Sequence, residues 1–214
     1  MTWRARALVA ALAACSSTAA VAHPHVFAEA TLQVTVGADG NVEQLGHVWR
    51  FDDLFSSTVL LEFDENKDLK LDEAELQKVA DVVHGSLEEF DYFQLVSADG
   101  KDVAMKKPER FLASFDDNML TIMFASQPEM PLKLAGKLGF GVYDPTFYTA
   151  IDFTDDATMM VENMPARCSK SVVRPDPEEA LAENQENLTD AFFEDPSAND
   201  MSKIFATRLE LNCG

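Results

Sequence analysis

The feature that most constrains the fold is a run in which polar and apolar residues alternate, followed by a turn and a second extended run. Residues 31–36 have the sequence Thr-Leu-Gln-Val-Thr-Val, and residues 42–51 form a second extended run after Asp39-Gly40. Alternation places every second side chain on one face of a sheet, and an Asp-Gly pair favours a hairpin turn. The two runs therefore predict a β-hairpin with one buried face.

The apolar spacing then changes to the period of a helix, in residues 54–63 and again in residues 72–90. The apolar face of the second segment is formed by Leu76, Val79, Ala80, Val83 and Leu87. We therefore expect a helix pair, inserted within residues 52–91.

Extended patterns resume after the helix pair. They occupy residues 93–96, 110–115, 119–124, 137–143 and 147–153. Residues 176–194 predict an acidic helix, and residues 206–212 predict a closing strand. The expected fold is α+β: a mainly antiparallel sheet or sandwich with an inserted helix pair and a C-terminal acidic helix.

The first 22 residues have the parts of a secretory signal peptide: two arginines, an apolar segment over residues 7–14, and small residues that end at Ala22. Cleavage after Ala22 leaves residues 23–214 as one secreted domain, which we expect in the periplasm. The alternative is acylation at Cys15, because residues 12–15 (Leu-Ala-Ala-Cys) resemble the lipobox of a bacterial lipoprotein.

Cleavage after Ala22 also removes Cys15 and leaves an even pair, Cys168 and Cys213. In an oxidising compartment this pair predicts a disulfide, which stabilises the fold by roughly 2–4 kcal/mol. The closing strand is then placed to bring the two cysteines together.

The secreted chain is strongly acidic. The leader holds two of the 17 Lys and Arg residues and none of the 37 Asp and Glu residues, so the rest carries a formal net charge of −22. This charge repels nucleic acid and attracts cations. No segment approaches the roughly 20 apolar residues of a membrane helix.

The loop between the two expected helices, residues 64–75, has the oxygen spacing of an EF-hand. Its candidate ligands are Asp64, Asn66, Asp68, Lys70 (through its carbonyl), Asp72 and Glu75. Leu69 occupies the sixth position, where glycine is expected, and a left-handed backbone there costs another residue about 1–2 kcal/mol. We expect a weak calcium site; the alternative is a solvated acidic turn.

A second candidate site involves three of the four histidines. His23 and His25 lie at the new N-terminus, and His47 lies in the expected partner strand, so we expect the three rings to meet near one end of the sheet. Pro24 has no amide proton, which excludes a square-planar chelate through successive amides. The remaining ligands suit zinc, nickel, cobalt or copper, with zinc favoured.

Two carboxylates are candidates to support this site. Asp52 follows the strand of His47 and would bind the metal or orient an imidazole, and Asp144 is a further candidate. The alternative for His47 is a core position, because it alternates with Trp49 and Phe51 on one strand face. The alternative for the N-terminal histidines is a frayed polar end.

No catalytic motif is present. The sequence contains no G-x-S-x-G, H-E-x-x-H or C-x-x-C, and it has no glycine loop of the phosphate-binding type. We therefore expect no enzymatic activity. Hydrolysis by a metal-activated water is a weaker alternative that would require a bound zinc with an open position.

Several motifs together point to a family. They are His23-Pro24-His25-Val26, His47-x-Trp49-x-Phe51-Asp52, the acidic loop from Asp64, Asp91-Tyr92-Phe93, Tyr143-Asp144-Pro145-Thr146-Phe147-Tyr148 and Asp152-Phe153-Thr154. With these motifs the chain resembles domain-of-unknown-function family 1007, which is often described as the periplasmic component of an uncharacterised ABC-type transport system. The resemblance implies an accessory protein for the uptake or export of divalent metals.

Two functions follow as expectations. In the first, the protein captures a divalent transition metal through His23, His25 and His47 and delivers it to a membrane metal transporter. In the second, the protein is a non-enzymatic structural or interaction module, whose helix pair is set by calcium and whose sheet docks on the transporter.

Overall fold

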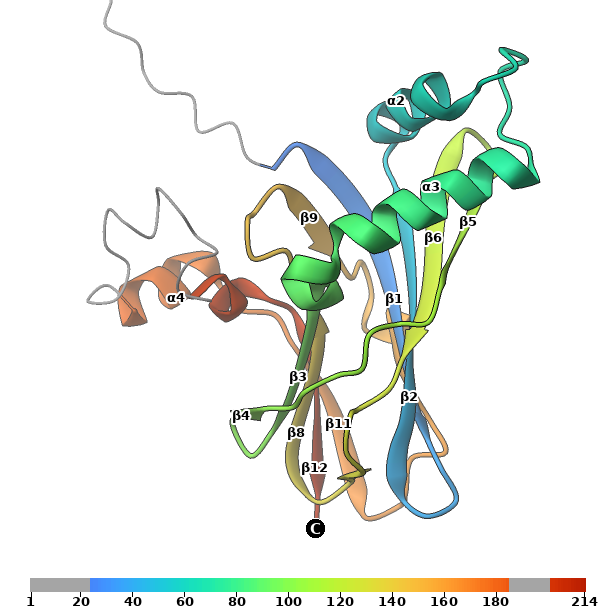
Figure 1. Cartoon of the computed structure of the whole chain (residues 1–214). Coiled ribbons are helices and arrows are strands. Elements are labelled where there is room, and N and C mark those ends of the chain that lie inside the picture. The colour runs from blue at the N-terminus through green and yellow to red at the C-terminus, as the bar shows by residue number, and fades with distance from the viewer. Residues whose placement is uncertain (1–23, 185–200) are drawn as a thin grey trace, which may run out of the picture.

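The computed structural model describes residues 24–184 and 201–214, whose strands form two sheets on either side of one apolar core (Figure 1). The strands of the first sheet are β1 (Val26–Val36), β2 (Asn41–Phe51), β5 (Phe111–Asp116), β6 (Met119–Ser126), β7 (Leu132–Lys133), β9 (Thr149–Asp152) and β10 (Met159–Glu162). Their order is β10-β1-β2-β6-β5, with β7 also beside β2 and β9 beside β1.

The second sheet has the order β11-β12-β8-β3-β4. Its strands are β3 (Gln94–Ala98), β4 (Lys101–Asp102), β8 (Gly136–Val142), β11 (Cys168–Val173) and β12 (Arg208–Cys213). All strand pairs in this sheet are antiparallel. The prediction of a mixed fold built mainly on antiparallel sheet is confirmed.

The predicted hairpin is confirmed as β1 and β2. Every second residue of β1, from Val26 to Val36, is buried, as the alternating pattern requires. In β2 the buried positions include His47, Trp49 and Phe51, which share the inward face. The antiparallel register places Leu32 opposite His47 and Ala28 opposite Phe51.

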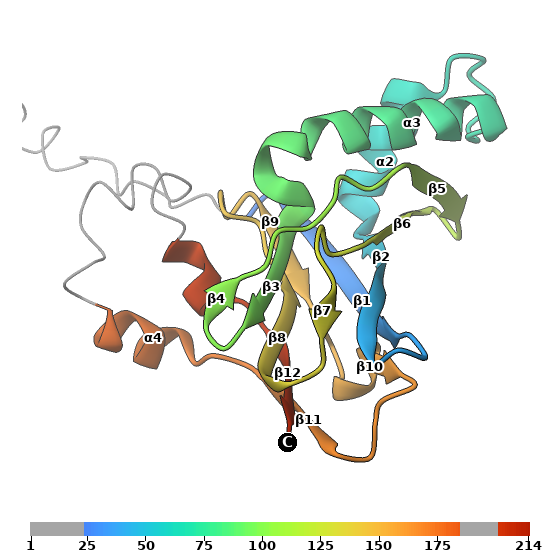
Figure 2. The ribbon, with the colours of Figure 1, turned by 60° about the horizontal axis from the view of Figure 1, so that its bottom comes forward.

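Two short strands depart from the antiparallel pattern, because β9 and β10 both pair with β1 in parallel. Figure 2 shows β10 beside β1. Met159 lies opposite Leu32 in this pairing, and both side chains are fully buried. The sequence did not predict β10, since its four residues are too few to show a period.

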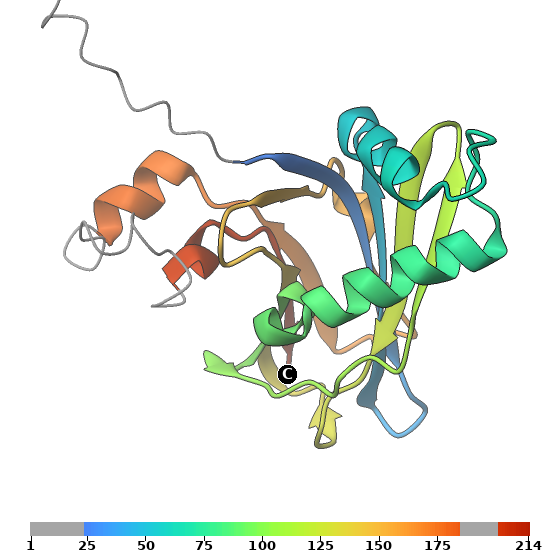
Figure 3. The same cartoon turned by 45° about the horizontal axis from the view of Figure 1, so that its top comes forward.

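The helix pair is α2 (Asp53–Phe63) and α3 (Glu73–Ser86). Helix α3 runs across the molecule from the first sheet towards the second (Figure 1 and Figure 3), and its Val79 and Ala80 are buried in the common core. No helix among residues 24–184 and 201–214 is long and apolar enough to cross a membrane.

The second helix is shorter than predicted. It ends at Ser86 and is followed by a 3-10 segment, Glu88–Phe93, in which Asp91, Tyr92 and Phe93 have left-handed φ angles of 48°, 56° and 60°. Burial of the two aromatic side chains offsets the cost of this backbone. The Asp91-Tyr92-Phe93 motif is thus a left-handed turn that leads the chain into β3.

The acidic helix near the C-terminus begins as predicted and is described for seven residues. Helix α4 (Pro177–Glu183) follows the N-cap Asp176, whose carboxylate accepts the backbone N–H groups of Glu178 and Glu179. The remainder of the predicted helix, from residue 185 to 194, lies outside the described residues.

The predicted disulfide joins Cys168 to Cys213. These residues are directly opposite one another where β11 pairs with β12. The closing strand was predicted, whereas β11 was not, because its three exposed polar residues are consecutive and show no alternation. The disulfide fixes this pairing at the end of the chain.

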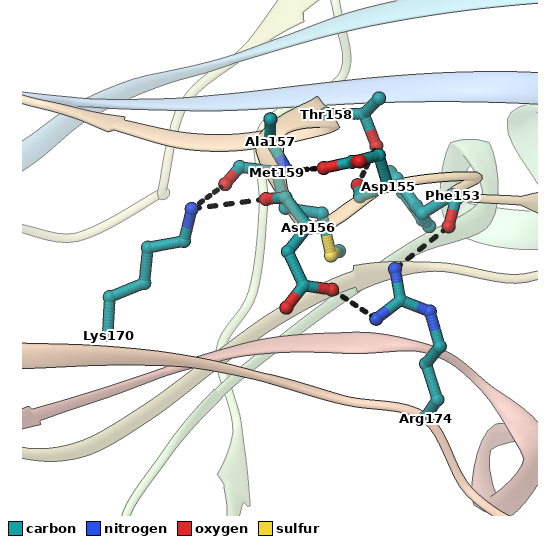
Figure 4. Close-up of polar contacts among 8 residues, drawn as sticks. All are labelled: Phe153, Asp155, Asp156, Ala157, Thr158, Met159, Lys170 and Arg174. Atoms are coloured by element: carbon teal, nitrogen blue, oxygen red, sulfur yellow. Dashed lines mark hydrogen bonds and ion pairs between the residues drawn. The ribbon is translucent and has the colours of Figure 1, made fainter.

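Two cations on and after β11 tie the second sheet to the segment that precedes β10 (Figure 4). The Lys170 ammonium donates to the carbonyl oxygens of Asp156, at 3.2 Å, and of Met159. The Arg174 guanidinium donates to the carbonyl oxygen of Phe153, at 2.9 Å, and forms an ion pair with the Asp156 carboxylate. These contacts hold both sheets at one edge of the core.

Candidate metal sites

His47 is a core residue in the structure. Its side chain is 1% exposed, and its ring stacks on Phe124 with the ring centroids 4.3 Å apart. Burial lowers the pKa of His47 to about 3, so the imidazole is neutral at physiological pH. Its Nε2 atom faces the Ser126 hydroxyl at 3.5 Å, and its Nδ1 atom has no hydrogen-bond partner within the described part of the chain.

The structure does not bring His47 to His25. His47 pairs with Leu32, which lies seven residues beyond His25 along the chain. At the rise of a β-strand this is a separation of roughly 20 Å. His25 itself is exposed, and its ring lies 5.0 Å from that of Tyr148. His23 lies outside the described residues.

The two supporting carboxylates have structural hydrogen bonds. Asp52 caps α2 by accepting the N–H of Phe55 at 2.9 Å, and its other oxygen accepts the N–H of Phe27 at 2.9 Å. Asp144 is buried and accepts the N–H groups of Thr146 and Thr149. Asp52 therefore lies near the strand end that carries His25, away from His47.

The neutral state of His47 predicts a pH-dependent stability. The ordinary pKa of 6.5 applies to the unfolded chain and the pKa of about 3 to the folded one, so protons bind preferentially to the unfolded state as the pH falls. Between pH 7 and pH 5 this group should cost roughly 2 kcal/mol of the free energy of unfolding. Urea denaturation at pH 7 and at pH 5 measures this change in the free energy of unfolding. The His47→Phe variant should lose correspondingly less stability than the wild type between these pH values, and the His84→Gln variant should lose as much as the wild type.

The acidic loop takes an unusual backbone conformation. Lys67 and Leu69 are both left-handed, each with a φ of 62°. Leu69 thus adopts the turn for which the calcium-loop pattern places glycine at this position, although its side chain is 70% exposed and gains little from burial. The energetic cost of a left-handed backbone at Leu69 was predicted from the sequence, whereas the left-handed conformation of Lys67 was not.

Side-chain oxygens of the first half of the loop accept backbone N–H groups from later in the loop. The two oxygens of Asp64 accept from Asp68 at 3.1 Å and from Leu69 at 2.9 Å. Asn66 also accepts from Asp68, and Asp68 accepts from Lys70 at 2.9 Å. These bonds wrap the chain around the Asp64 carboxylate.

The second half of the loop is organised by Glu75, whose side chain is 3% exposed. One of its oxygens accepts the N–H of Glu65 and the other accepts the N–H of Asp72, both at 2.9 Å. The Asp72 carboxylate accepts the N–H groups of Ala74 and Glu75 in return, which completes a capping box at the start of α3. Glu75 therefore joins both ends of the loop.

Nowhere in residues 24–184 and 201–214 do three His, Cys, Asp or Glu side chains gather closely enough to hold a metal ion together. In the loop, four carboxylates accept backbone N–H groups: those of Asp64, Asp68, Asp72 and Glu75. Binding of a cation would require these oxygens to exchange amide hydrogens for the ion, which a hard cation with oxygen ligands can drive.

Replacement of Leu69 by glycine tests the strain directly. Leu69→Gly should raise the free energy of unfolding by about 0.5–1 kcal/mol, because relief of the left-handed strain exceeds the extra backbone entropy of glycine. Lys70→Gly, at a neighbouring position without a left-handed φ, should lower it by a similar amount. Urea denaturation measures both changes, and an equal loss in the two variants would contradict a strained Leu69.

The fold and these sites define an α+β protein of two sheets, with a helix pair inserted between β2 and β3. The family model described as a protein of unknown function, domain-of-unknown-function family 1007, matches residues 8–213. The chain belongs to this family. Comparison with curated proteins finds no match.

Proposed function

We propose that this protein is a calcium-stabilised interaction module without enzymatic activity. The observation that carries the proposal is the left-handed backbone of Leu69, held by the bond from its N–H to Asp64. A chain accepts this conformation in a non-glycine residue only where its surroundings impose it. The loop therefore already has a left-handed residue at the sixth position, where the calcium-loop pattern places glycine.

The set of oxygen atoms supports the same ion. Carboxylates, an amide oxygen and a backbone carbonyl are ligands for a hard cation, and the loop offers no sulfur or imidazole. The net charge of −20 favours any cation at the surface, and the spacing selects calcium within that class. Glu75 is the one acidic side chain of the loop that is buried, as the last ligand of such a loop should be.

The expected affinity is weak. The bonds that the carboxylates already make to backbone N–H groups oppose the ion, because the ion must displace them. We therefore expect a dissociation constant of about 10⁻⁴–10⁻³ M, as in extracellular calcium modules. An ion of this affinity would stabilise the helix pair and would not act as a signal.

Thermal melts test the proposal. At about 10 mM calcium, a site of this affinity should stabilise the fold by about 1.4–2.7 kcal/mol and raise the melting midpoint by roughly 3–10 °C. Glu75→Gln should abolish most of this rise, because it removes the charged ligand; the glutamine oxygen can still accept the N–H of Asp72, and the bond from the N–H of Glu65 is lost. Glu73→Gln removes the same charge from an exposed position of α3 and should retain the rise. An unchanged wild-type midpoint would contradict the proposal.

We place this module in the periplasm, with a membrane transporter as its partner. The signal-peptide pattern of residues 1–22 supports export, and the family resemblance supports the transporter. The module would contribute binding rather than chemistry, since no acid–base or nucleophile pair stands out in the sequence.

The second candidate function is capture of a transition metal at the N-terminus. The specific observation in its favour is that the Asp52 carboxylate accepts the backbone N–H of Phe27, which follows His25 by two residues in the chain. His25 is exposed at this point, and the chain continues from it towards His23. The proposed ligands are therefore His23, His25 and Asp52, without His47.

Titration calorimetry tests this second candidate in the secreted chain that starts at His23. Zinc should bind with micromolar or tighter affinity, about −8 kcal/mol, and His25→Ala should weaken the binding by about tenfold or more. His47→Phe should bind zinc like the wild type, because the His47 ring is enclosed in the core. Equal heats for wild type and His25→Ala would remove the N-terminal site.

A further inference from the structure

We propose that the outward face of the first sheet carries a groove that binds an extended acidic and aliphatic segment of a partner protein. The proposal rests on the interaction-module part of the proposed function and is independent of the calcium loop. The groove has a volume of about 610 Å³. Residues of β1, β2, β5 and β6 form its floor, and the segment before β5 forms one wall.

A row of three apolar side chains and one threonine crosses the floor of the groove. The strand registers place Thr31 beside Val48, Val48 beside Met123, and Met123 beside Leu112. Val48 is 38% exposed and Leu112 is 45% exposed. Four neighbouring strands therefore present a continuous contact surface to solvent, on the face opposite to the core.

The next row of the floor is hollow, since Gly46 lies opposite Ala125 and both lack long side chains. Position 46 has room for a side chain, because a Cβ atom there would approach only Gln33, at 3.9 Å. The backbone of Gly46 has no left-handed φ either. A larger residue would fit the fold at this position, so the hollow is a property of the surface rather than of the core.

The charge on the wall indicates the partner. The residues that line the groove include three basic side chains, Lys106, Lys107 and Arg110, and one acidic side chain, Glu109. The whole chain has the opposite balance, with 17 basic and 37 acidic residues. A basic wall on an acidic protein favours a negatively charged partner at this groove.

Two of these cations are available to a ligand. Lys107 forms an ion pair with Glu88 at 2.6 Å. Lys106 and Arg110 form no ion pair within the part of the chain that the structure describes. An extended segment with alternating carboxylates and small aliphatic side chains would pair with these cations and cover the apolar row.

The test uses a display library of random linear peptides, panned on the wild-type protein and counter-selected on Gly46→Val. Enriched sequences should be acidic with small aliphatic residues. In fluorescence anisotropy, an enriched peptide should bind Gly46→Val and the double variant Lys106→Glu/Arg110→Glu about tenfold or more weakly than the wild type. Enrichment of basic peptides, or of none, would overturn the proposal.

Two control variants separate the groove from general effects. Ser114→Val places a valine outside the groove, on β5, and Lys133→Glu makes a charge change on β7; both should bind like the wild type. Circular dichroism melts confirm that each variant folds. If the controls lose as much affinity as the groove variants, the groove is not the binding site.

The same binding measured in calcium and in chelator distinguishes this proposal from the calcium site. Binding that persists in chelator supports the groove even where calcium fails to raise the melting midpoint. If calcium raises the melting midpoint but no acidic peptide is selected, the calcium proposal is supported and the groove proposal is overturned.

Discussion

The β1–β2 hairpin is the element on which the rest of the structure depends. Every other strand of the first sheet attaches to it directly or through β6, and its inward face forms one wall of the common core. The hairpin also positions the inserted helix pair, because Asp52, directly after β2, caps α2. A change at the inward face of this hairpin would therefore affect both sheets and the helices.

The motif His47-x-Trp49-x-Phe51-Asp52 acquires a structural explanation from this arrangement. Its three rings are buried on one face of β2, and its carboxylate holds α2 and the start of β1. Tyr143 to Tyr148 form a comparable unit, in which Asp144 organises the turn before β9. Motifs of this kind mark positions where packing and hydrogen bonds are exacting, and they do not by themselves identify ligands for a metal.

Local patterns predicted the local structure well. Alternation identified β1, extended patterns identified β2 and β6, and the oxygen spacing singled out the loop in which Leu69 is left-handed. The parallel partners of β1 could not be predicted, since they depend on contacts between residues far apart in sequence. The separation of His25 from His47 follows from the hairpin register, and the position of the Asp39-Gly40 turn in the sequence was sufficient to predict that register. The groove could not be predicted from the sequence, because it depends on which outward residues become neighbours across four strands, and only the strand register gives these neighbours.

A calcium titration followed by ¹⁵N-resolved NMR tests the proposed calcium site in residues 64–75 most directly. The account predicts that the amide of Leu69, which donates to Asp64, shifts together with the amides of residues 64–75 and saturates at one ion per chain. Unchanged amide signals across this loop at millimolar calcium would contradict it.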